Sequence, residues 1–524
     1  MKRLLSSVAL LLSLSLLAQD APRLDVDTIM RGPGLTGYAP RNVRWSRDGQ
    51  LVYFQWKQYS DPTEEQFDTY VAGRDGKGLR KLSDEEAKDA PPVNGRWTRD
   101  RKRAVYVDNG DVFLYDSAAR KRRAITKTTE AESNARFTRE ENRVTFVRGN
   151  NLFVVSLQDG TIEQKTNIVG ANDKGPNVTL FDDENKDRTA SQKWVAEEAK
   201  KLSEVLGRRA AEKKEEDEKR KKELAIAPLK LKSGESVSDL ELTPDGRYVI
   251  AFIGVEADKA KRPVVPSYVT ATGYTTDLPA RTKVGDVQEA SRVASISTVD
   301  GKVQWLKHGL KPATPQNDEN AQKTGAKTQS VTQNATEATA EKTETKEPQE
   351  RDVELAGLFW SDDGAHAVLP VRANDNKDWW LLAFDPATAA TRVLFHEHDP
   401  AWVQWLEDNK AGFIPNTSTV WLISEQSGWL QLYSVPYAGG EPRALTTGKY
   451  EIDDVAFSDD KKNFYLTTSM ESPFERHLYR MPVSGGAMTK LTASAGFHNA
   501  VMSPDGTTLA DVYSYTNKPP ELYV

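Results

Sequence analysis

The chain has 524 residues, no cysteine and nearly balanced charges, with 71 lysines and arginines against 77 aspartates and glutamates. The lack of cysteine excludes disulfide bonds, thiol catalysis and thiolate metal sites. A formal net charge of −6 argues against nucleic-acid binding, which needs a concentrated basic face. With 38% hydrophobic residues and 12 tryptophans, the chain is apolar enough to fold around a large core.

The N-terminal segment has the pattern of a secretion signal. Lys2 and Arg3 precede an apolar stretch from Leu4 to Leu17, and the chain turns polar directly after Ala18. This order is typical of a cleaved signal peptide, and the apolar run is short for a membrane span. We therefore expect residues 1–18 to be removed and the protein to be exported, periplasmic or extracellular, without a membrane span. An uncleaved anchor is the alternative.

A short sequence phrase recurs through the rest of the chain. It consists of an aromatic or large apolar residue, Ser or Thr, one variable residue and an acid, often followed by Gly. Five of the seven spacings between copies lie between 40 and 52 residues, which is the length of a propeller blade of four strands. The copies begin at Trp45, Trp97, Phe137, Leu242, Trp360, Trp405, Phe457 and Met502.

Each copy combines turn chemistry with strands. In the copy at 242–246, Pro sets φ, Asp can bond back to the backbone and Gly accepts a positive φ. A β-branched and aromatic run such as 247–252 follows each turn, and a second such run follows that one. We predict an all-β protein, an eight-bladed β-propeller of four-stranded blades over residues 37–524, with seven blades as the alternative. Residues 19–36 are expected to form an N-terminal extension.

Two long spacings contain insertions. Within 186–228, apolar residues recur at helical intervals up to Ala210, and residues 212–223 contain no apolar residue, which predicts an inserted charged helix. Residues 311–350 are rich in Thr, Gln, Ala, Lys and Glu, with Val331 as the single large apolar residue. This composition cannot bury enough surface to offset its ordering entropy, so we predict a disordered, flexible loop.

Two motifs have residue types that occur at sites of chemistry. Residues Gly32–Gly37 match GxGxxG, but Pro33 stiffens the segment and no helix start follows, so a plain loop is predicted. The run His396–Asp399 contains metal-ligand residue types, but its position before Pro400 favours a polar surface loop. No serine has glycine two residues before and two residues after it, so there is no nucleophile elbow. We predict no catalytic residue, no metal site and no cofactor in this chain.

The C-terminal part of the chain, from about Trp402 onward, resembles the propeller of dipeptidyl peptidase IV-like enzymes, which belong to the prolyl oligopeptidase family of serine peptidases. The resemblance is carried by residues 423–433 (ISEQSGWLQLY), 439–446 (GGEPRALT), 471–479 (ESPFERHLY) and 519–523 (PPELY). Members of that family join an eight-bladed propeller to a C-terminal α/β-hydrolase domain that holds Ser, Asp and His. The resemblance implies that this chain is the propeller part, that the α/β-hydrolase domain is absent, and that the chain alone is inactive.

The resemblance also implies a binding role. In dipeptidyl peptidases, a Trp-Val-x-Glu-Glu motif holds the amino terminus of the substrate, and residues 194–198 (WVAEE) match it. Glu197 and Glu198 would hold an ammonium group through charge-assisted hydrogen bonds. Two solvent-facing glutamates on a charged helix are the alternative. The expected function is to restrict access of peptide substrates to a separate or missing hydrolase domain, and a stand-alone secreted propeller that binds proteins is the alternative.

Overall fold

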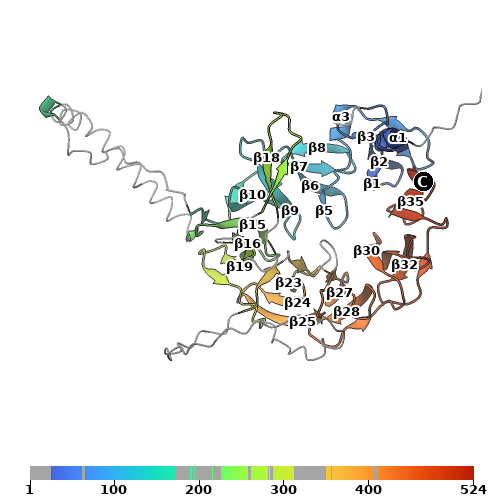
Figure 1. Cartoon of the computed structure of the whole chain (residues 1–524). Coiled ribbons are helices and arrows are strands. Elements are labelled where there is room, and N and C mark those ends of the chain that lie inside the picture. The colour runs from blue at the N-terminus through green and yellow to red at the C-terminus, as the bar shows by residue number, and fades with distance from the viewer. Residues whose placement is uncertain are drawn as a thin grey trace, which may run out of the picture.

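The structure is a computed structural model in which eight antiparallel sheets follow one another around a ring (Figure 1). Each sheet begins with its innermost strand, and the later strands lie progressively further out. This confirms the all-β eight-bladed propeller, and the seven-bladed alternative is wrong. The structure describes residues 25–61, 65–171, 226–257, 263–280, 287–311, 350–355, 357–404 and 411–524, with the positions 189–191, 194, 215, 261 and 283.

Blades 1 to 3 are regular four-stranded meanders. The turn between β6 and β7 shows why the sequence folds this way, since Asn109 and Gly110 have φ values of 49° and 85°. Positive φ at both positions gives the turn type whose twist matches paired strands. The strands are β1 (Arg41–Trp45), β2 (Leu51–Trp56), β3 (Asp68–Gly73) and β4 (Arg80–Lys81); β5 (Arg96–Trp97), β6 (Arg103–Asp108), β7 (Asp111–Asp116) and β8 (Lys121–Ala124); β9 (Glu132–Phe137), β10 (Arg143–Arg148), β11 (Asn151–Ser156) and β12 (Ile162–Gln164). Between blades 1 and 2 lies α3 (Asp84–Lys88), where Ser83 and Glu86 form a capping box.

Blades 4 and 5 carry additional strands. Blade 4 contains β15 (Glu235–Leu242), β16 (Tyr248–Val255), β19 (Ala290–Ser297) and β20 (Val303–Trp305), and a separate hairpin of β17 (Val264–Ser267) and β18 (Thr276–Pro279) stands between β16 and β19. Blade 5 contains β21 (Val353–Leu355), β22 (Phe359–Trp360), β23 (Ala367–Ala373), β24 (Asp378–Asp385) and β25 (Ala390–His398), with β21 and β22 both paired to β23. A parallel pair, β13 (Ile168–Val169) and β14 (Leu229–Lys230), precedes blade 4.

Blades 6 to 8 complete the ring. Blade 8 has three strands rather than the four expected. The strands are β26 (Ala411–Phe413), β27 (Thr419–Ser424), β28 (Gln431–Pro436) and β29 (Arg443–Ala444); β30 (Ile452–Phe457), β31 (Asn463–Thr468), β32 (His477–Pro482) and β33 (Thr489–Lys490); β34 (Phe497–Met502), β35 (Leu509–Tyr515) and β36 (Lys518–Tyr523).

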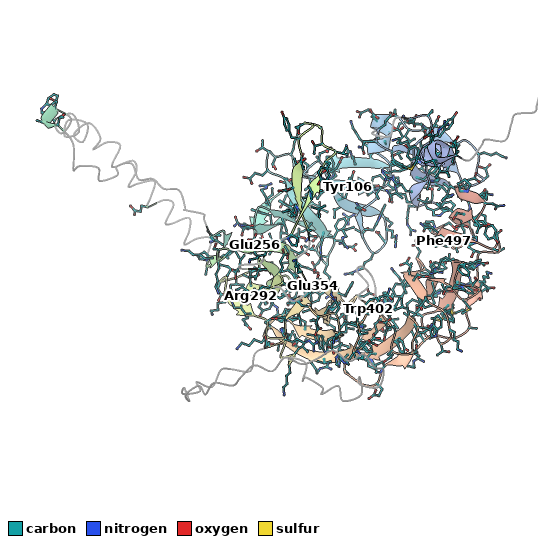
Figure 2. The ribbon with its side chains drawn as sticks, in the orientation of Figure 1. Tyr106, Glu256, Arg292, Glu354, Trp402 and Phe497 are labelled. Carbon is teal, nitrogen blue, oxygen red and sulfur yellow. The ribbon has the colours of Figure 1, made fainter. Side chains whose placement is uncertain are left out.

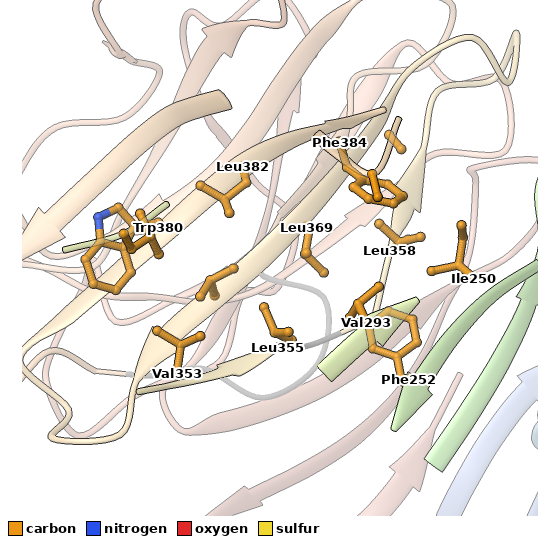
Figure 3. Packing of buried hydrophobic residues seen from close by; sticks show 14 of the residues in the cluster. Ile250, Phe252, Val293, Val353, Leu355, Leu358, Leu369, Trp380, Leu382 and Phe384 are labelled. Atoms are coloured by element: carbon orange, nitrogen blue, oxygen red, sulfur yellow. The ribbon is translucent and has the colours of Figure 1, made fainter. Parts of the chain in front are cut away.

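Most of the hydrophobic core lies between neighbouring blades. Side chains crowd the blades around the open centre of the ring (Figure 2). One cluster between blades 4 and 5 contains Ile250 and Phe252 of β16, Leu369 of β23, and Leu382 and Phe384 of β24 (Figure 3). Ile250 and Leu369 are fully buried. A fully buried side chain of this size contributes roughly 1.5–3 kcal/mol relative to an exposed one. Packing against the neighbouring blade therefore adds to the stability that each sheet has from its own hydrogen bonds.

Side chains, rather than a shared strand, close the ring between blades 1 and 8. The indole Nε1 of Trp45 donates to the carbonyl oxygen of Val501 at 2.9 Å, and Trp45 packs in one cluster with Ala510 and Leu522. Arg74 forms an ion pair with Asp505 at 2.7 Å. The C-terminus lies beside blade 1 (Figure 1).

The segment before blade 1 contains α1 (Val26–Ile29) and α2 (Pro33–Thr36), and neither has a buried residue. The expected plain loop at Gly32–Gly37 is therefore wrong, because Pro33 begins one helical turn. Proline favours the first position of a helix, where its missing N–H needs no partner. Residues 1–18 and nearly all of the two predicted insertions, 186–228 and 311–350, lie outside the described residues. Within the described part of the chain, no helix is long and apolar enough to cross a membrane.

Candidate functional site

In seven blades the recurring phrase forms the turn between the first and second strand, here called the inner turn. The expected copy at Trp405 is wrong for blade 6, because it precedes β26 and residues 414–418 form the inner turn there. In blade 1, the Ser46 hydroxyl donates to Asp48 Oδ1 at 2.5 Å and accepts from the Leu51 N–H at 2.9 Å. The Thr138 hydroxyl makes no such bond to Glu140, whose side chain is one carbon longer. The same pair of bonds recurs at Thr98, Thr243, Ser361, Ser458 and Ser503. The phrase thus fixes each turn so that the variable residue projects from its tip.

The inner turns of distant blades meet. Arg47 Nη1 of blade 1 lies 2.7 Å from Asp459 Oδ2 of blade 7, and Arg101 Nε of blade 2 lies 3.5 Å from Asp459 Oδ1. Blades 1 and 8 separate blade 2 from blade 7 along the ring. The contact between Arg101 and Asp459 therefore crosses the central channel at the end where the inner turns lie.

A cavity of about 540 Å³ lies beside the inner turns of blades 3, 4 and 5. At its base, Arg136 of β9 forms an ion pair with Glu241 of β15 at 2.5 Å, and the Trp360 indole donates to Glu241 Oε1 at 2.7 Å. Arg136 also lies 3.2 Å from Asp239. The rim is charged and is formed by Arg99, Arg139, Glu140, Arg143, Lys165, Asp245 and Asp362.

The two carboxyl groups that contact Arg136, those of Glu241 and Asp239, have raised pKa values. Burial raises the pKa of Glu241, and the neighbouring Arg136 opposes the rise without cancelling it. Burial likewise raises the pKa of Asp239, with Arg136 again opposing. A buried carboxylate with one cationic partner depends strongly on that partner. The Glu241 carboxylate therefore depends on Arg136 as its cationic partner.

Sequence reasoning missed a second repeated feature, in the innermost strands. An Asn or Asp stands three residues before the first residue of the phrase in six of the eight copies. The strand register breaks there in blades 1, 3, 4 and 7, and Asn42 and Asn134 have φ values of 53° and 51°. Asn and Asp tolerate positive φ better than other side chains. The feature is therefore a β-bulge that recurs at the same place in several blades. The signal that could have predicted this bulge is the Asn or Asp at a fixed offset of three residues before the phrase.

The residues predicted as sites fall in different places. Glu197 and Glu198 lie outside the described residues, so their role stays a prediction. The surface loop expected at His396–Asp399 is wrong, because His396–His398 end β25 and pair with β24. There, Asp378 accepts from both His396, at 2.7 Å, and His398, at 2.9 Å, and Arg351 occupies its other oxygen at 2.6 Å. No group of three potential ligands in the described part of the chain could hold a metal ion.

One glycine of an inner turn offers a direct test of turn packing. Gly364 has a φ of 67°, and a Cβ built on it would lie 2.5 Å from Pro244 Cβ of the neighbouring blade. Gly364→Ala is expected to lower the free energy of unfolding by about 1–2 kcal/mol for the left-handed backbone, plus the cost of displacing Pro244. Gly246→Ala is the matched control, since Gly246 has a φ of 71° and open space around it. Equal losses in urea unfolding would show that the two turns do not pack tightly.

Comparisons with known proteins agree with this architecture. Residues 316–520 match the family described as dipeptidyl peptidase IV (DPP IV) N-terminal region. The chain is 42% identical over 151 residues to a probable dipeptidyl peptidase 4 of Aspergillus flavus, covering 27% of this chain and 20% of that protein. It is 26% identical over 181 residues to dipeptidyl peptidase 4 of Trichophyton equinum, covering 33% and 23%. The matches thus span about a fifth to a quarter of the length of these relatives.

Solved structures show the same fold at low sequence identity. The crystal structure of Porphyromonas gingivalis dipeptidyl peptidase 4 aligns with a TM-score of 0.56 and 14% identity, over 96% of this chain and 60% of that chain. A putative dipeptidyl aminopeptidase IV from Bacteroides ovatus aligns with a TM-score of 0.51 and 13% identity, over 94% and 59%.

The ring of eight blades defines the chain as a β-propeller. The family match and the relatives support its assignment as an N-terminal propeller domain of dipeptidyl peptidase IV-like peptidases, and the resemblance found in the sequence is confirmed.

Proposed function

We propose that this chain is the propeller part of an exported dipeptidyl peptidase IV-like serine peptidase, in which it gates peptide access and binds the amino terminus of the substrate. The observation that carries the proposal is the match of residues 316–520 to the dipeptidyl peptidase IV N-terminal region, within a complete ring of blades. Peptide-bond cleavage is assigned to an α/β-hydrolase domain, in which Ser attacks the carbonyl and His transfers the proton.

Substrate capture is assigned to Glu197 and Glu198. A free ammonium group donates hydrogen bonds, and two neighbouring carboxylates can accept them. Such charge-assisted bonds are stronger than neutral ones. An acetylated amino terminus has neither the charge nor the donors. The propeller would therefore select peptides by their free amino terminus.

Titration calorimetry with a short peptide and its N-acetylated form tests this assignment. A hydrogen bond to a charged group contributes about 1.5–3 kcal/mol, so acetylation is expected to weaken binding on the order of 10- to 100-fold. The Glu197→Gln/Glu198→Gln variant is expected to lose this discrimination. The control is Glu215→Gln/Glu216→Gln, which removes the same charge from the same insertion.

Other outcomes decide between the candidate functions. Equal affinity for the free and acetylated peptides would contradict recognition of the amino terminus. Release of the chromophore from a chromogenic dipeptide substrate by this chain alone would contradict the assignment of chemistry to another domain. Binding of a folded protein partner without any affinity for peptides would favour the stand-alone scaffold.

A further inference from the structure

The variable residue of the phrase has opposite charges on opposite sides of the ring, beside other charged residues of each turn. The variable residue of the phrase is arginine in three consecutive blades, at Arg47, Arg99 and Arg139 of blades 1 to 3. In blades 5 and 7, the same position holds Asp362 and Asp459. Opposite charges attract across a narrow opening with low-dielectric walls more strongly than in open water. The two sides of the channel mouth are therefore drawn together at this end.

Asp459 makes direct contact with arginines of two other blades. It accepts Arg47 of blade 1 on one oxygen, at 2.7 Å, and lies 3.5 Å from Arg101 of blade 2 through the other. The carboxylate side chain is 25% exposed. The carboxylate of blade 7 thus contacts the inner turns of blades 1 and 2, which lie beyond blade 8 along the ring.

The backbone at three of these turns holds a long charged side chain at a cost, a cation in blades 2 and 7 and Glu141, with a φ of 57°, in blade 3. Gly49, Gly246, Gly364 and Gly506 occupy the fourth position after the start of the phrase, all with positive φ. At this position blade 2 has Arg101, with a φ of 54°, and blade 7 has Lys461, with a φ of 62°. A residue with a Cβ costs roughly 1–2 kcal/mol in this conformation. Strain of this kind tends to persist where the side chain has a function.

Neighbouring turns support the two sides of the mouth. Arg99 Nη2 donates to the Arg139 carbonyl oxygen at 3.1 Å, which joins the tips of blades 2 and 3. The Asn416 N–H of blade 6 donates to Asp362 Oδ2 at 2.8 Å. These contacts join neighbouring turns within each side, whereas the contacts of Asp459 join blade 7 to blades 1 and 2.

We propose that the inner turns form an electrostatic gate across this end of the central channel, with Asp459 as the residue that holds it shut against Arg47 and Arg101. The gate deepens the proposed gating of peptide access, and rests on it for its biological role. In a meander, connections between blades lie at the end opposite to the inner turns. Residues 170 and 226, which flank the segment with Glu197 and Glu198, belong to such a connection. While the gate is shut, peptides enter the channel from that other end.

The absence of cysteine allows a direct distance measurement on the full chain. Spin labels on cysteines introduced at Lys102 of blade 2 and Lys462 of blade 7 flank the gate, and both side chains are more than two-thirds exposed. Pulsed electron paramagnetic resonance is expected to give one narrow distance distribution at low salt. Asp459→Asn is expected to shift it to longer distances, and 1 M salt is expected to do the same, since the screening length falls to about 3 Å.

Two further variants separate the gate from general stability. Asp75→Asn removes the same charge from an ion pair confined to one turn of blade 1, and is expected to leave the distribution unchanged. Arg101→Gly relieves the backbone strain, so the unfolding midpoint is expected to hold or rise while the distance lengthens. An unchanged distribution in both Asp459→Asn and Arg101→Gly would overturn the proposal. The distance measurement uses no peptide, so its outcome does not depend on whether the chain binds peptides.

Discussion

Replacing Arg136 with methionine is expected to lower the free energy of unfolding at pH 8 by about 3–5 kcal/mol, the typical cost of breaking a buried ion pair on one side. Arg136 lies 2.5 Å from Glu241, whose carboxyl group is buried at the base of the cavity between blades 3, 4 and 5. Methionine retains most of the apolar stem, so the loss reports the missing charge. Urea unfolding followed by tryptophan fluorescence measures it.

The loss is expected to depend on pH in a defined direction. Burial raises the pKa of Glu241 above its usual value, so the folded state binds this proton more tightly than the unfolded state. Stability from the neutral carboxyl is fully present below the usual pKa of about 4.3 and is lost as pH rises toward the raised value. Without Arg136 the raised value is higher still. The penalty of Arg136→Met is therefore expected to be smaller at pH 5 than at pH 8.

A double variant is the control for this prediction. Glu241→Gln removes the charge and retains an oxygen that can accept the Trp360 indole N–H. In Arg136→Met/Glu241→Gln the fully buried charge is gone and Asp239, which also contacts Arg136, is the carboxyl group that remains. Part of the lost stability is therefore expected to return, and the pH dependence to become weaker. A double variant as unstable as the single one would show that Arg136 acts through packing instead.

The sequence predicted the blades because their signals are local. The phrase at Trp45–Gly49 encodes one turn through residues at fixed offsets, and its copies mark the inner turns of seven of the eight blades. The count of eight included the copy at Trp405, which precedes the first strand of blade 6. The bulge at Asn42 and Asn134 is equally local, with an Asn or Asp three residues before the phrase, but it was not predicted.

The contacts at the two candidate sites could not be predicted in the same way. Arg47 and Asp459 are separated by 412 positions in the sequence, and Arg136 and Glu241 by 105. Their pairing depends on how far each blade is rotated around the ring, which no short pattern encodes. His396 was misplaced in a loop for a related reason, since its pairing with Trp380 of β24 decides its conformation.

Trp45→Ala is expected to have the other large effect, because it opens the junction between the first and last blades. Trp45 is 9% exposed, and its indole donates to the Val501 carbonyl oxygen at 2.9 Å. Truncating a buried tryptophan to alanine costs about 3–5 kcal/mol. Elsewhere along the ring, neighbouring blades are also joined by the chain, but here these side-chain contacts are what join blade 1 to blade 8. We expect the unfolding midpoint in urea to fall accordingly.

Trp45→Phe separates the two contributions at this junction. It retains an aromatic ring in the cluster with Ala510 and Leu522 but leaves the Val501 carbonyl oxygen without its donor. Loss of one such hydrogen bond costs about 1–3 kcal/mol when the partner stays buried. The phenylalanine variant is therefore expected to lie between the wild-type protein and Trp45→Ala. If Trp45→Ala unfolds at the wild-type midpoint, the junction does not limit stability, and blades 1 and 8 are held together by Arg74 and Asp505 instead. Since that ion pair is partly exposed, its contribution would then fall as salt is added.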